Sequence, residues 1–238
     1  MRKNIYYIIL LLFLMSCDKE TERLTGYEIH GLDVSHYQSK VNWDEVAAND
    51  IHFTFVKATE GEELKDSLFA NNWKDLKRVG IKRGAYHFFR PTLSPLQQAR
   101  NFIQAVKLEP GDLPPVLDVE VTNNASTGVI TTRIRTWLEI MEMHYCVRPI
   151  IYTNLNFYKK YIAEEFQDYP IWIARYNYAE PGLSNHDQWQ FWQYGNRGRI
   201  PGVNGDVDFN VFHGTLEELS KLGVQPPVDV SDVAAAPY

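Results

Sequence analysis

Cysteine and basic runs are both scarce in this chain. Its 238 residues include two cysteines, Cys17 and Cys146, and no cluster of Lys and Arg. The formal net charge of -6 argues against a nucleic acid as partner, because nucleic-acid-binding surfaces concentrate positive side chains. With so few thiols, the fold must be stabilised by its hydrophobic core. Aromatic residues, by contrast, are abundant at 13%, which fits a cleft lined with flat rings.

The first sixteen residues, MRKNIYYIILLLFLMS, are interpreted as an export signal. Arg2 and Lys3 give a basic start, and the apolar run from Ile5 to Met15 is shorter than the roughly 20 residues of a membrane-spanning helix. The sequence LMSC resembles the lipobox of bacterial lipoproteins, in which the cysteine becomes the lipidated first residue. We therefore expect a lipid anchor on Cys17; the alternative is an ordinary signal peptide with an incidental cysteine.

The remaining chain predicts one domain with short polar ends. Residues 17–27 lack periodicity and predict a polar tether, residues 28–222 predict a single barrel domain, and the Pro-rich residues 223–238 predict a loose tail. If Cys17 is lipidated, Cys146 is the only thiol left and no internal disulfide can form. Cys146 ends an apolar-patterned helix, so we expect it to be buried.

Strand-like and helix-like patterns alternate from IHGLDVS to NFYKKYIAEEF. Such alternation is typical of βαβ units and a parallel sheet. After that point YPIWIARY, QWQFWQYG and DVDFNVF follow one another as strands with only loops between them. The sequence therefore predicts an α/β fold, an irregular TIM-like (β/α)5(β)3 barrel, in which ligand sites gather at the carboxyl ends of the strands.

One apolar stretch, LPPVLDVEV, contains two carboxylates, Asp118 and Glu120. Residues two apart on a strand share a face, so both side chains are expected to project toward the barrel axis. Two carboxyl groups in a partly apolar pocket do not ionise freely, and the pKa of one is raised. A protonated acid beside an ionised one is the pair that glycoside hydrolysis needs.

Other strand ends carry acids as well. Asp33 ends the strand HGLDVS, and Asp206 and Asp208 lie in GDVDFN. Clustered acids can also bind Ca²⁺ or Mg²⁺. Because the chain has no EF-hand loop, no HExxH spacing and no ligand pattern among its histidines, we predict neither a metal site nor a cofactor.

Taken together, several segments resemble family 25 glycoside hydrolase lysozymes in order and spacing, over residues 29 to 213. These segments are GLDVSHYQ, FVKATEG followed by Asp66, GAYHFFRP, PPVLDVE, IIYTN, WIARY and FWQYGNRGRIPGVNGDVDFNVF. The resemblance implies a (β/α)5(β)3 barrel that cleaves the β-1,4 bond between N-acetylmuramic acid and N-acetylglucosamine in peptidoglycan. Family members often carry cell-wall-binding repeats, and membrane tethering would replace them in this chain.

The resemblance also implies roles for four acids. Glu120 corresponds to the general acid, Asp118 to the carboxylate two residues before it, and Asp33 to the acid on the first strand. Asp208 corresponds to the acid on the last strand and is preferred to Asp206. We expect the substrate's 2-acetamido group to attack the anomeric carbon with Asp118 orienting it, which retains configuration; an inverting route, with Asp118 or Asp208 as base for a water, stays open.

Aromatic rings near strand ends can stack on sugar faces. Among them we predict substrate contacts for Tyr86, which matches a tyrosine lining the family's site, and for Tyr152 and Trp192. His87 alternates away from Tyr86 and is expected to be structural. For Lys57 and Glu60 of KATEG, a family role and a structural ion pair are equally open, and Arg175 is left unassigned.

The expected partners are peptidoglycan glycan strands and, through Cys17, a membrane. We expect a monomeric, membrane-anchored lipoprotein of the cell envelope, on its periplasmic or its outer side. Three other functions stay open: a lipoprotein that binds cell-wall glycan without cutting it, a barrel glycosidase acting on chitin-like polymers, and an envelope protein whose acids bind a cation.

Overall fold

The computed structural model describes residues 20–176, 179–183 and 188–226. The predicted export signal and Cys17 lie outside these residues, as do residues 227–238 of the predicted tail. No helix in the described part of the chain has the length and apolar character needed to cross a bilayer.

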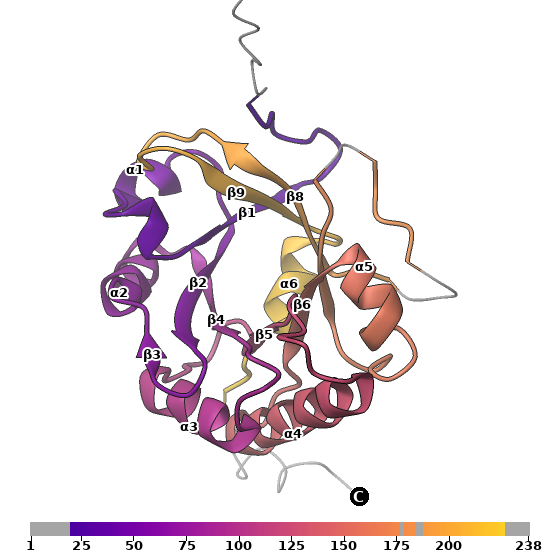
Figure 1. Ribbon diagram of the computed structural model, residues 1–238. Helices are drawn as coiled ribbons and strands as arrows, with labels where there is room; N and C mark the ends of the chain where they lie inside the picture. The colour runs from indigo at the N-terminus through magenta and orange to yellow at the C-terminus, as the bar shows by residue number, and fades with distance from the viewer. Residues whose placement is uncertain (1–19, 177–178, 184–187, 227–238) are drawn as a thin grey trace, which may run out of the picture.

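A closed barrel forms the centre of the molecule (Figure 1). Within the described ranges its eight strands are β1 (Ile29–Val34), β2 (Phe53–Glu60), β4 (Lys82–Phe88), β5 (Val116–Asp118), β6 (Ile150–Asn154), β7 (Ile171–Ala174), β8 (Phe191–Gly198) and β9 (Val207–Phe212). Neighbouring strands are parallel from β1 to β8, whereas β9 runs antiparallel to both β8 and β1. The pairing of β1 with β2 closes the barrel, and the short β3 (Leu64–Lys65) pairs with the end of β2.

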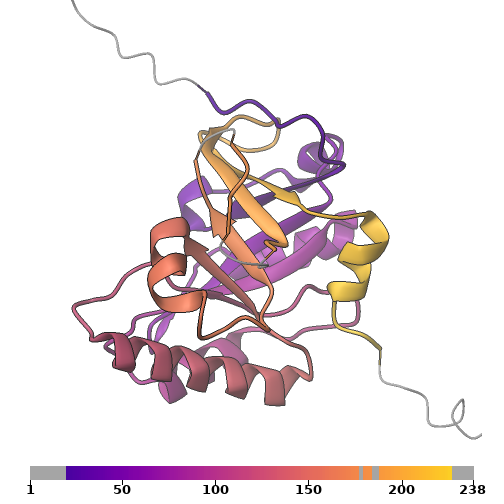
Figure 2. The ribbon, with the colours of Figure 1, turned by 90° about the vertical axis from the view of Figure 1, so that its right-hand side faces the viewer.

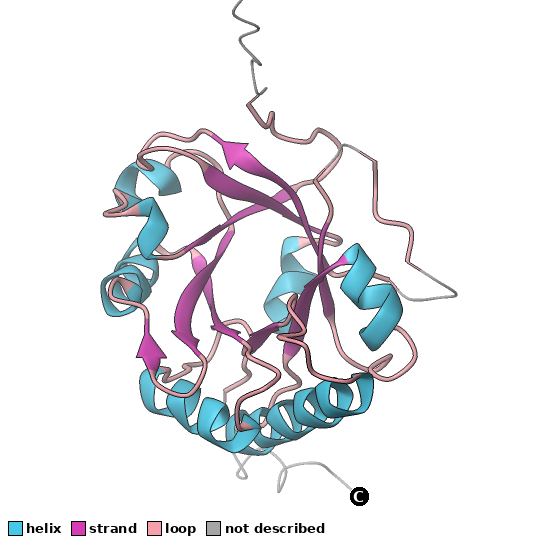
Figure 3. Ribbon diagram, viewed as in Figure 1, coloured by secondary structure: helices cyan, strands magenta, loops and turns pink. Residues whose placement is uncertain are grey.

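Helices follow each of the first five barrel strands and cover the outside of the barrel (Figure 3). They are α1 (Trp43–Ala47), α2 (Phe69–Val79), α3 (Pro95–Ala105), α4 (Thr127–Tyr145), and α5 (Leu155–Phe157) with the π-helical turn η2 (Tyr158–Ile162). A single 3₁₀ turn, η1 (His36–Gln38), follows β1. No helix is described between β7 and β9, so the predicted (β/α)5(β)3 barrel is confirmed over the described residues.

The hydrophobic core has two layers because strand side chains alternate between the two faces of the barrel wall. Leu32, Val56 and Leu117 belong to the outer layer beneath the helices. The inner layer fills the barrel with Phe53, Phe55, Trp172, Phe191 and eight other buried residues. The Phe55 and Trp172 rings stack with their centroids 4.3 Å apart.

Two glycines make room for these rings. A Cβ on Gly31 would lie 2.4 Å from the Phe53 ring, and one on Gly84 would lie 2.5 Å from the Phe55 ring. The absence of a side chain at both positions therefore lets large rings fill the interior of the barrel and close it beneath the carboxyl ends of the parallel strands.

The end of the barrel opposite the carboxyl ends of the parallel strands is closed by α6 (Leu216–Leu222), which follows β9 (Figure 2). Leu219 and Leu222 pack into the inner core, and a capping box between Thr215 and Glu218 begins the helix. Gly111 and Val224 then pair through their backbones, with an N–O distance of 2.8 Å. Gly223 and Val224 therefore lie against the domain, which corrects the prediction of a loose tail for these two residues.

The segment 20–27 also belongs to the folded domain. Thr21 forms a bridge with Gly198, at the end of β8, and its amide donates to the Arg197 carbonyl at 3.0 Å. Arg23 donates to the backbone carbonyls of Asn49 and Asp50. The prediction of a polar tether is thus wrong for residues 20–27, because backbone pairing and the Arg23 side chain hold them against the barrel.

Cys146 is exposed, contrary to the prediction. It follows the last turn of α4 with a φ of 54°, in the left-handed region, and this reversal of the chain turns its side chain away from the apolar face of the helix.

Candidate active site

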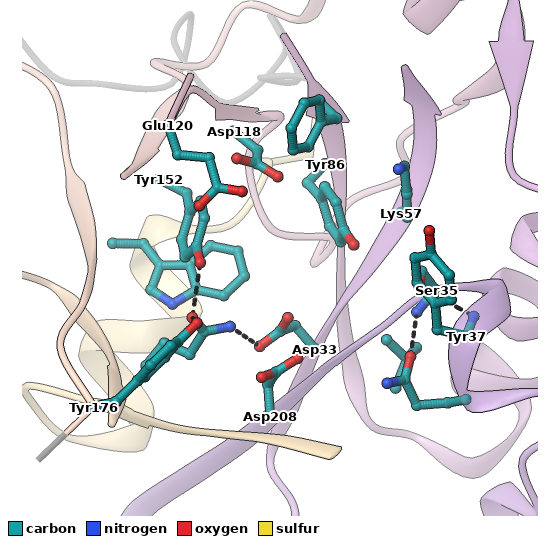
Figure 4. A pocket seen from close by; sticks show the side chains of 15 residues that line it. Asp33, Ser35, Tyr37, Lys57, Tyr86, Asp118, Glu120, Tyr152, Tyr176 and Asp208 are labelled. Atoms are coloured by element: carbon teal, nitrogen blue, oxygen red, sulfur yellow. Dashed lines mark hydrogen bonds between the residues drawn. The ribbon is translucent and has the colours of Figure 1, made fainter. Parts of the chain in front are cut away.

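A cavity of about 250 Å³ opens at the carboxyl ends of the parallel strands (Figure 4). Asp33, Asp118, Glu120 and Asp208, the four acids predicted from the sequence, all line it. Its other lining residues are Val34, Ser35, Tyr37, Gln38, Lys57, Tyr86, Phe88, Tyr152, Trp172, Tyr176 and Gln193. Acids from the first strand, the end of the middle strand β5 and the last strand thus meet in one pocket.

Asp118 and Glu120 reach the pocket because β5 alternates its side chains. Asp118 is the last residue of β5 and Glu120 lies two residues beyond it, while Leu117 and Val119 point into the outer core. Burial raises the pKa of Glu120, and the positive charge of Lys57 partly offsets this. The sequence-based prediction that the two acids share a face is confirmed.

Asp118 is the more deeply buried of the two acids. Burial and then the charge of Glu120 raise the pKa of Asp118 well above its ordinary value. Its Oδ1 atom is buried and has no hydrogen-bond partner among the described residues. A buried carboxyl oxygen without a donor is costly, so this atom is available to a donor from a ligand.

Asp33 and Asp208 form a second carboxyl pair. They stand directly opposite each other on the antiparallel strands β1 and β9, and their carboxyl groups hydrogen-bond to one another. Burial raises both pKa values, that of Asp33 to about 6 and that of Asp208 to about 9. Asp206, by contrast, is exposed and lies 2.9 Å from Arg199, outside the pocket.

Two neutral amides, which no sequence motif indicated, support Asp33. Gln193 on β8 and Asn210 on β9 both donate to Asp33 Oδ2, at 2.8 and 2.7 Å. The Oε1 atom of Gln193 accepts from the hydroxyls of Tyr152 and Tyr176, at 2.7 and 3.0 Å. An amide has no sequence signature of its own; only the carboxylate that it contacts gives it a role.

Lys57 brings a positive charge to the wall of the pocket. Its Nζ atom lies 2.7 Å from Glu60 Oε2, and Arg90 contacts the other oxygen of Glu60. The ion pair that the sequence left open is therefore present, and Lys57 also faces the two acids of β5.

Aromatic rings line the pocket as expected. Tyr86 and Tyr152 both lie in its wall. Tyr37 and Tyr176, which are 78% and 55% exposed, stand at its rim, where their ring faces are open to a ligand.

Known proteins of one family resemble this chain in sequence and in structure. The sequence profile of glycosyl hydrolases family 25 matches residues 32–203. This chain belongs to that family. YegX, an uncharacterized protein of Escherichia coli strain K12, is 44% identical over 199 residues, which cover 82% of this chain and 73% of YegX. Lysozyme M1 of Streptomyces globisporus is 35% identical over 82% of this chain and 71% of its own length.

Solved structures show the same relationship. A family 25 glycosyl hydrolase from Bacillus anthracis superposes with a TM-score of 0.82 at 34% identity, covering 87% of this chain and 99% of that one. The bacterial lysozyme from Streptomyces coelicolor gives a TM-score of 0.77 at 33% identity, over 83% of this chain and 98% of that one. The chain is therefore a glycoside hydrolase of family 25, with the barrel of its relatives.

Trp192 lies outside the pocket of this family 25 hydrolase, contrary to the prediction of a substrate contact. Alternation along β8 turns Phe191 and Gln193 into the barrel and Trp192 outward. The Trp192 ring contacts Tyr27, and its Nε1 donates to the Arg175 carbonyl at 3.0 Å. Trp192 therefore stabilises the outer core.

Two other residues of the family 25 hydrolase are structural. His87 is fully buried, as expected, with Thr59 at 2.7 Å and Gln98 at 3.1 Å from its ring nitrogens. Arg175, left unassigned by the sequence, donates to the Glu180 carbonyl at 2.8 Å. Among the described residues, no group of three or more His, Cys, Asp and Glu side chains is arranged to hold a metal ion.

Proposed function

We propose that this family 25 hydrolase is a peptidoglycan hydrolase, an N-acetylmuramidase that cleaves the β-1,4 bond between N-acetylmuramic acid and N-acetylglucosamine. Relatives named as lysozymes support this substrate. The observation that carries the proposal is the meeting of Asp118 and Glu120 in one pocket at the end of β5, with Asp118 Oδ1 buried and without a donor among the described residues. An N–H group of a substrate would satisfy that oxygen.

Glu120 acts as the general acid. Because burial raises its pKa, a larger fraction of Glu120 stays protonated near neutral pH and can donate to the leaving glycosidic oxygen. Lys57 moderates this shift, so that Glu120 can release its proton as the bond breaks.

The substrate's own acetamido group acts as the nucleophile. Its carbonyl oxygen bonds to the anomeric carbon as the glycosidic bond breaks, and the leaving oxygen takes the proton of Glu120. Protonation of Glu120 removes one of the charges that raise the pKa of Asp118, and Lys57 lowers that pKa, so Asp118 is the acid of the pair that ionises. Its carboxylate accepts the acetamido N–H and stabilises the positive oxazolinium. Water then opens this ring, Glu120 takes up the proton from the water, and the configuration is retained.

The test is digestion of purified sacculi by a chain of residues 18–238, followed by mass spectrometry of borohydride-reduced fragments. Glu120→Gln keeps the shape but removes the acid, so we expect activity to fall by roughly 10² to 10⁴-fold. Asp206→Asn is the matched control because Asp206 lies outside the pocket, and it should keep wild-type activity.

The products decide between the proposal and its rivals. Reduced muramic acid ends from the wild type alone support the muramidase, and reduced N-acetylglucosamine ends contradict it. No fragments from either protein would indicate a glycan-binding protein, and equal release by both would mean that Glu120 is not the acid. NMR of the first product should show the β-anomer; the α-anomer would contradict acetamido assistance.

We also propose that the enzyme is held in the cell envelope by a lipid on Cys17. The lipobox-like LMSC and the basic, apolar start of the chain support this localisation.

A further inference from the structure

Side-chain amide donors are unevenly distributed around the Asp33 and Asp208 pair. Two side-chain amides, Gln193 and Asn210, donate to Asp33 Oδ2. No amide contact of this kind to Asp208 is present among the described residues. Two N–H donors on one oxygen favour the ionised form of Asp33.

Trp172 fixes the orientation of Asn210. The indole Nε1 can only donate, and it lies 2.8 Å from Asn210 Oδ1. The NH₂ group of Asn210 must therefore face the other way, toward Asp33.

The hydroxyls of Tyr152 and Tyr176 orient Gln193 in the same manner. Both donate to Gln193 Oε1, which leaves its NH₂ group directed at Asp33 (Figure 4). Side chains from strands β6 to β9, together with Tyr176 two residues beyond β7, thus act on one carboxyl oxygen.

We propose that Gln193 and Asn210 are positioning residues that hold Asp33 as the ionised member of the carboxyl pair, so that Asp208 keeps the shared proton. Two facing carboxyl groups can hydrogen-bond only if one of them carries a proton, and the amides decide which one does. The pair then carries one negative charge through the neutral pH range.

Other charged and titratable groups face Asp33 from the surrounding strands. They are Asp208 on β9, Asp118 and Glu120 at the end of β5, Lys57 on β2, Tyr86 on β4, Tyr152 on β6 and Tyr176 after β7. The ionised form of Glu120 raises the pKa of Asp33, so the two acids favour opposite protonation states. The consequence for catalysis rests on the proposed function. One fixed negative charge on Asp33 stabilises the positive oxazolinium, whereas repulsion from Asp33 keeps Asp208 from ionising as well.

The protonation order can be measured without substrate. A ¹³C NMR titration of the aspartate carboxyl carbons should show Asp33 titrating near pH 6 and Asp208 near pH 9. Gln193→Met removes one donor at nearly constant volume, and we expect it to raise the pKa of Asp33 by roughly one unit. Gln190→Met is the matched control, because Gln190 accepts from the Ile171 amide and should leave both titrations unchanged.

Tyr176→Phe is a second variant in case Gln193→Met does not fold. It removes one of the two hydroxyls that orient Gln193, from a half-exposed ring, and should shift the Asp33 pKa upward by a smaller amount. If Asp208 titrates before Asp33, or if neither variant moves the Asp33 titration, the proposal is overturned.

The pH profile of sacculus digestion adds a functional readout. Gln193→Met should move the acid limb of kcat/KM to higher pH, whereas a merely structural loss would lower activity by the same factor at every pH. An enzyme inactive on sacculi with the expected titration order would refute the proposed function and leave the protonation proposal intact.

Discussion

His87 shows how a buried histidine is held neutral. Gln98 Oε1 accepts from the Arg90 amide at 2.9 Å, so this oxygen also accepts from His87 Nε2. Nδ1 is then the acceptor for the Thr59 hydroxyl, and the ring stacks on Trp137. This arrangement has no place for a second proton, and burial lowers the pKa of His87 from 6.5 to about 4.

This shift predicts a pH-dependent stability. In the unfolded chain His87 binds a proton below about pH 6.5, but in the folded protein only below about pH 4. Protonation therefore favours unfolding, and the contribution present above pH 6.5 is lost as the pH falls to 4, by about 3 kcal/mol. The free energies of unfolding of wild type and of His87→Gln are measured in urea at pH 7 and at pH 4. The value for wild type relative to that for His87→Gln should be about 3 kcal/mol lower at pH 4 than at pH 7.

Replacement of the exposed His144, His144→Gln, serves as the control, and its free energy of unfolding should depend on pH as that of wild type does. A constant difference between wild type and His87→Gln across this range would mean that His87 is not held neutral.

The positions of some site residues could be predicted from the sequence, and the positions of others could not. The shared face of Asp118 and Glu120 was predicted correctly because alternation along a strand is a local rule. The pairing of Asp33 with Asp208 depends on the register of β1 against β9, which no local pattern contains. Gln193 and Asn210 depend on the same register, and as neutral amides they gave no signal.

At the level of elements, α2 and α4 end in the same left-handed conformation with different residues. Gly80 follows α2 with a φ of 79°, and Cys146 follows α4 with a φ of 54°. A residue with a Cβ is strained in this region, whereas glycine is not. A Cβ on Gly80 would meet no atom within 4 Å, so the backbone alone decides its preference.

We therefore expect opposite effects from two substitutions. Cys146→Gly should raise the free energy of unfolding by about 0.5 kcal/mol, since the relief of strain exceeds the greater freedom of glycine in the unfolded chain. Gly80→Ala should lower it by about 1 kcal/mol. Urea denaturation followed by circular dichroism measures both, and a less stable Cys146→Gly would contradict the argument.

Element types were easier to predict than their faces. The order of strands and helices followed from changes in hydrophobic period. In QWQFWQY, however, both sets of alternate residues include rings, so the pattern does not say which set faces inward, and Trp192 was assigned to the wrong face. The exposure of Cys146 was missed because it depends on the turn that ends α4.

On the scale of the whole molecule, the proposed anchor predicts where the enzyme is found. In cells making the full chain, the protein should sediment with membranes, and Cys17→Ser should prevent lipid attachment and release it to the soluble fraction. Cys146→Ser is the control and should leave the distribution unchanged. Equal distribution of wild type and Cys17→Ser would contradict lipidation at this position.

The attachment of Thr21 to the end of β8 has a spatial consequence. Gly198 lies at the carboxyl end of its strand, the same end at which the pocket opens, and Cys17 precedes Glu20 by three residues. A chain spans at most roughly 3.5 Å per residue, so three residues reach about 10 Å. A lipid on Cys17 would therefore keep the pocket close to the membrane, so that the enzyme could reach only the glycan strands nearest that membrane.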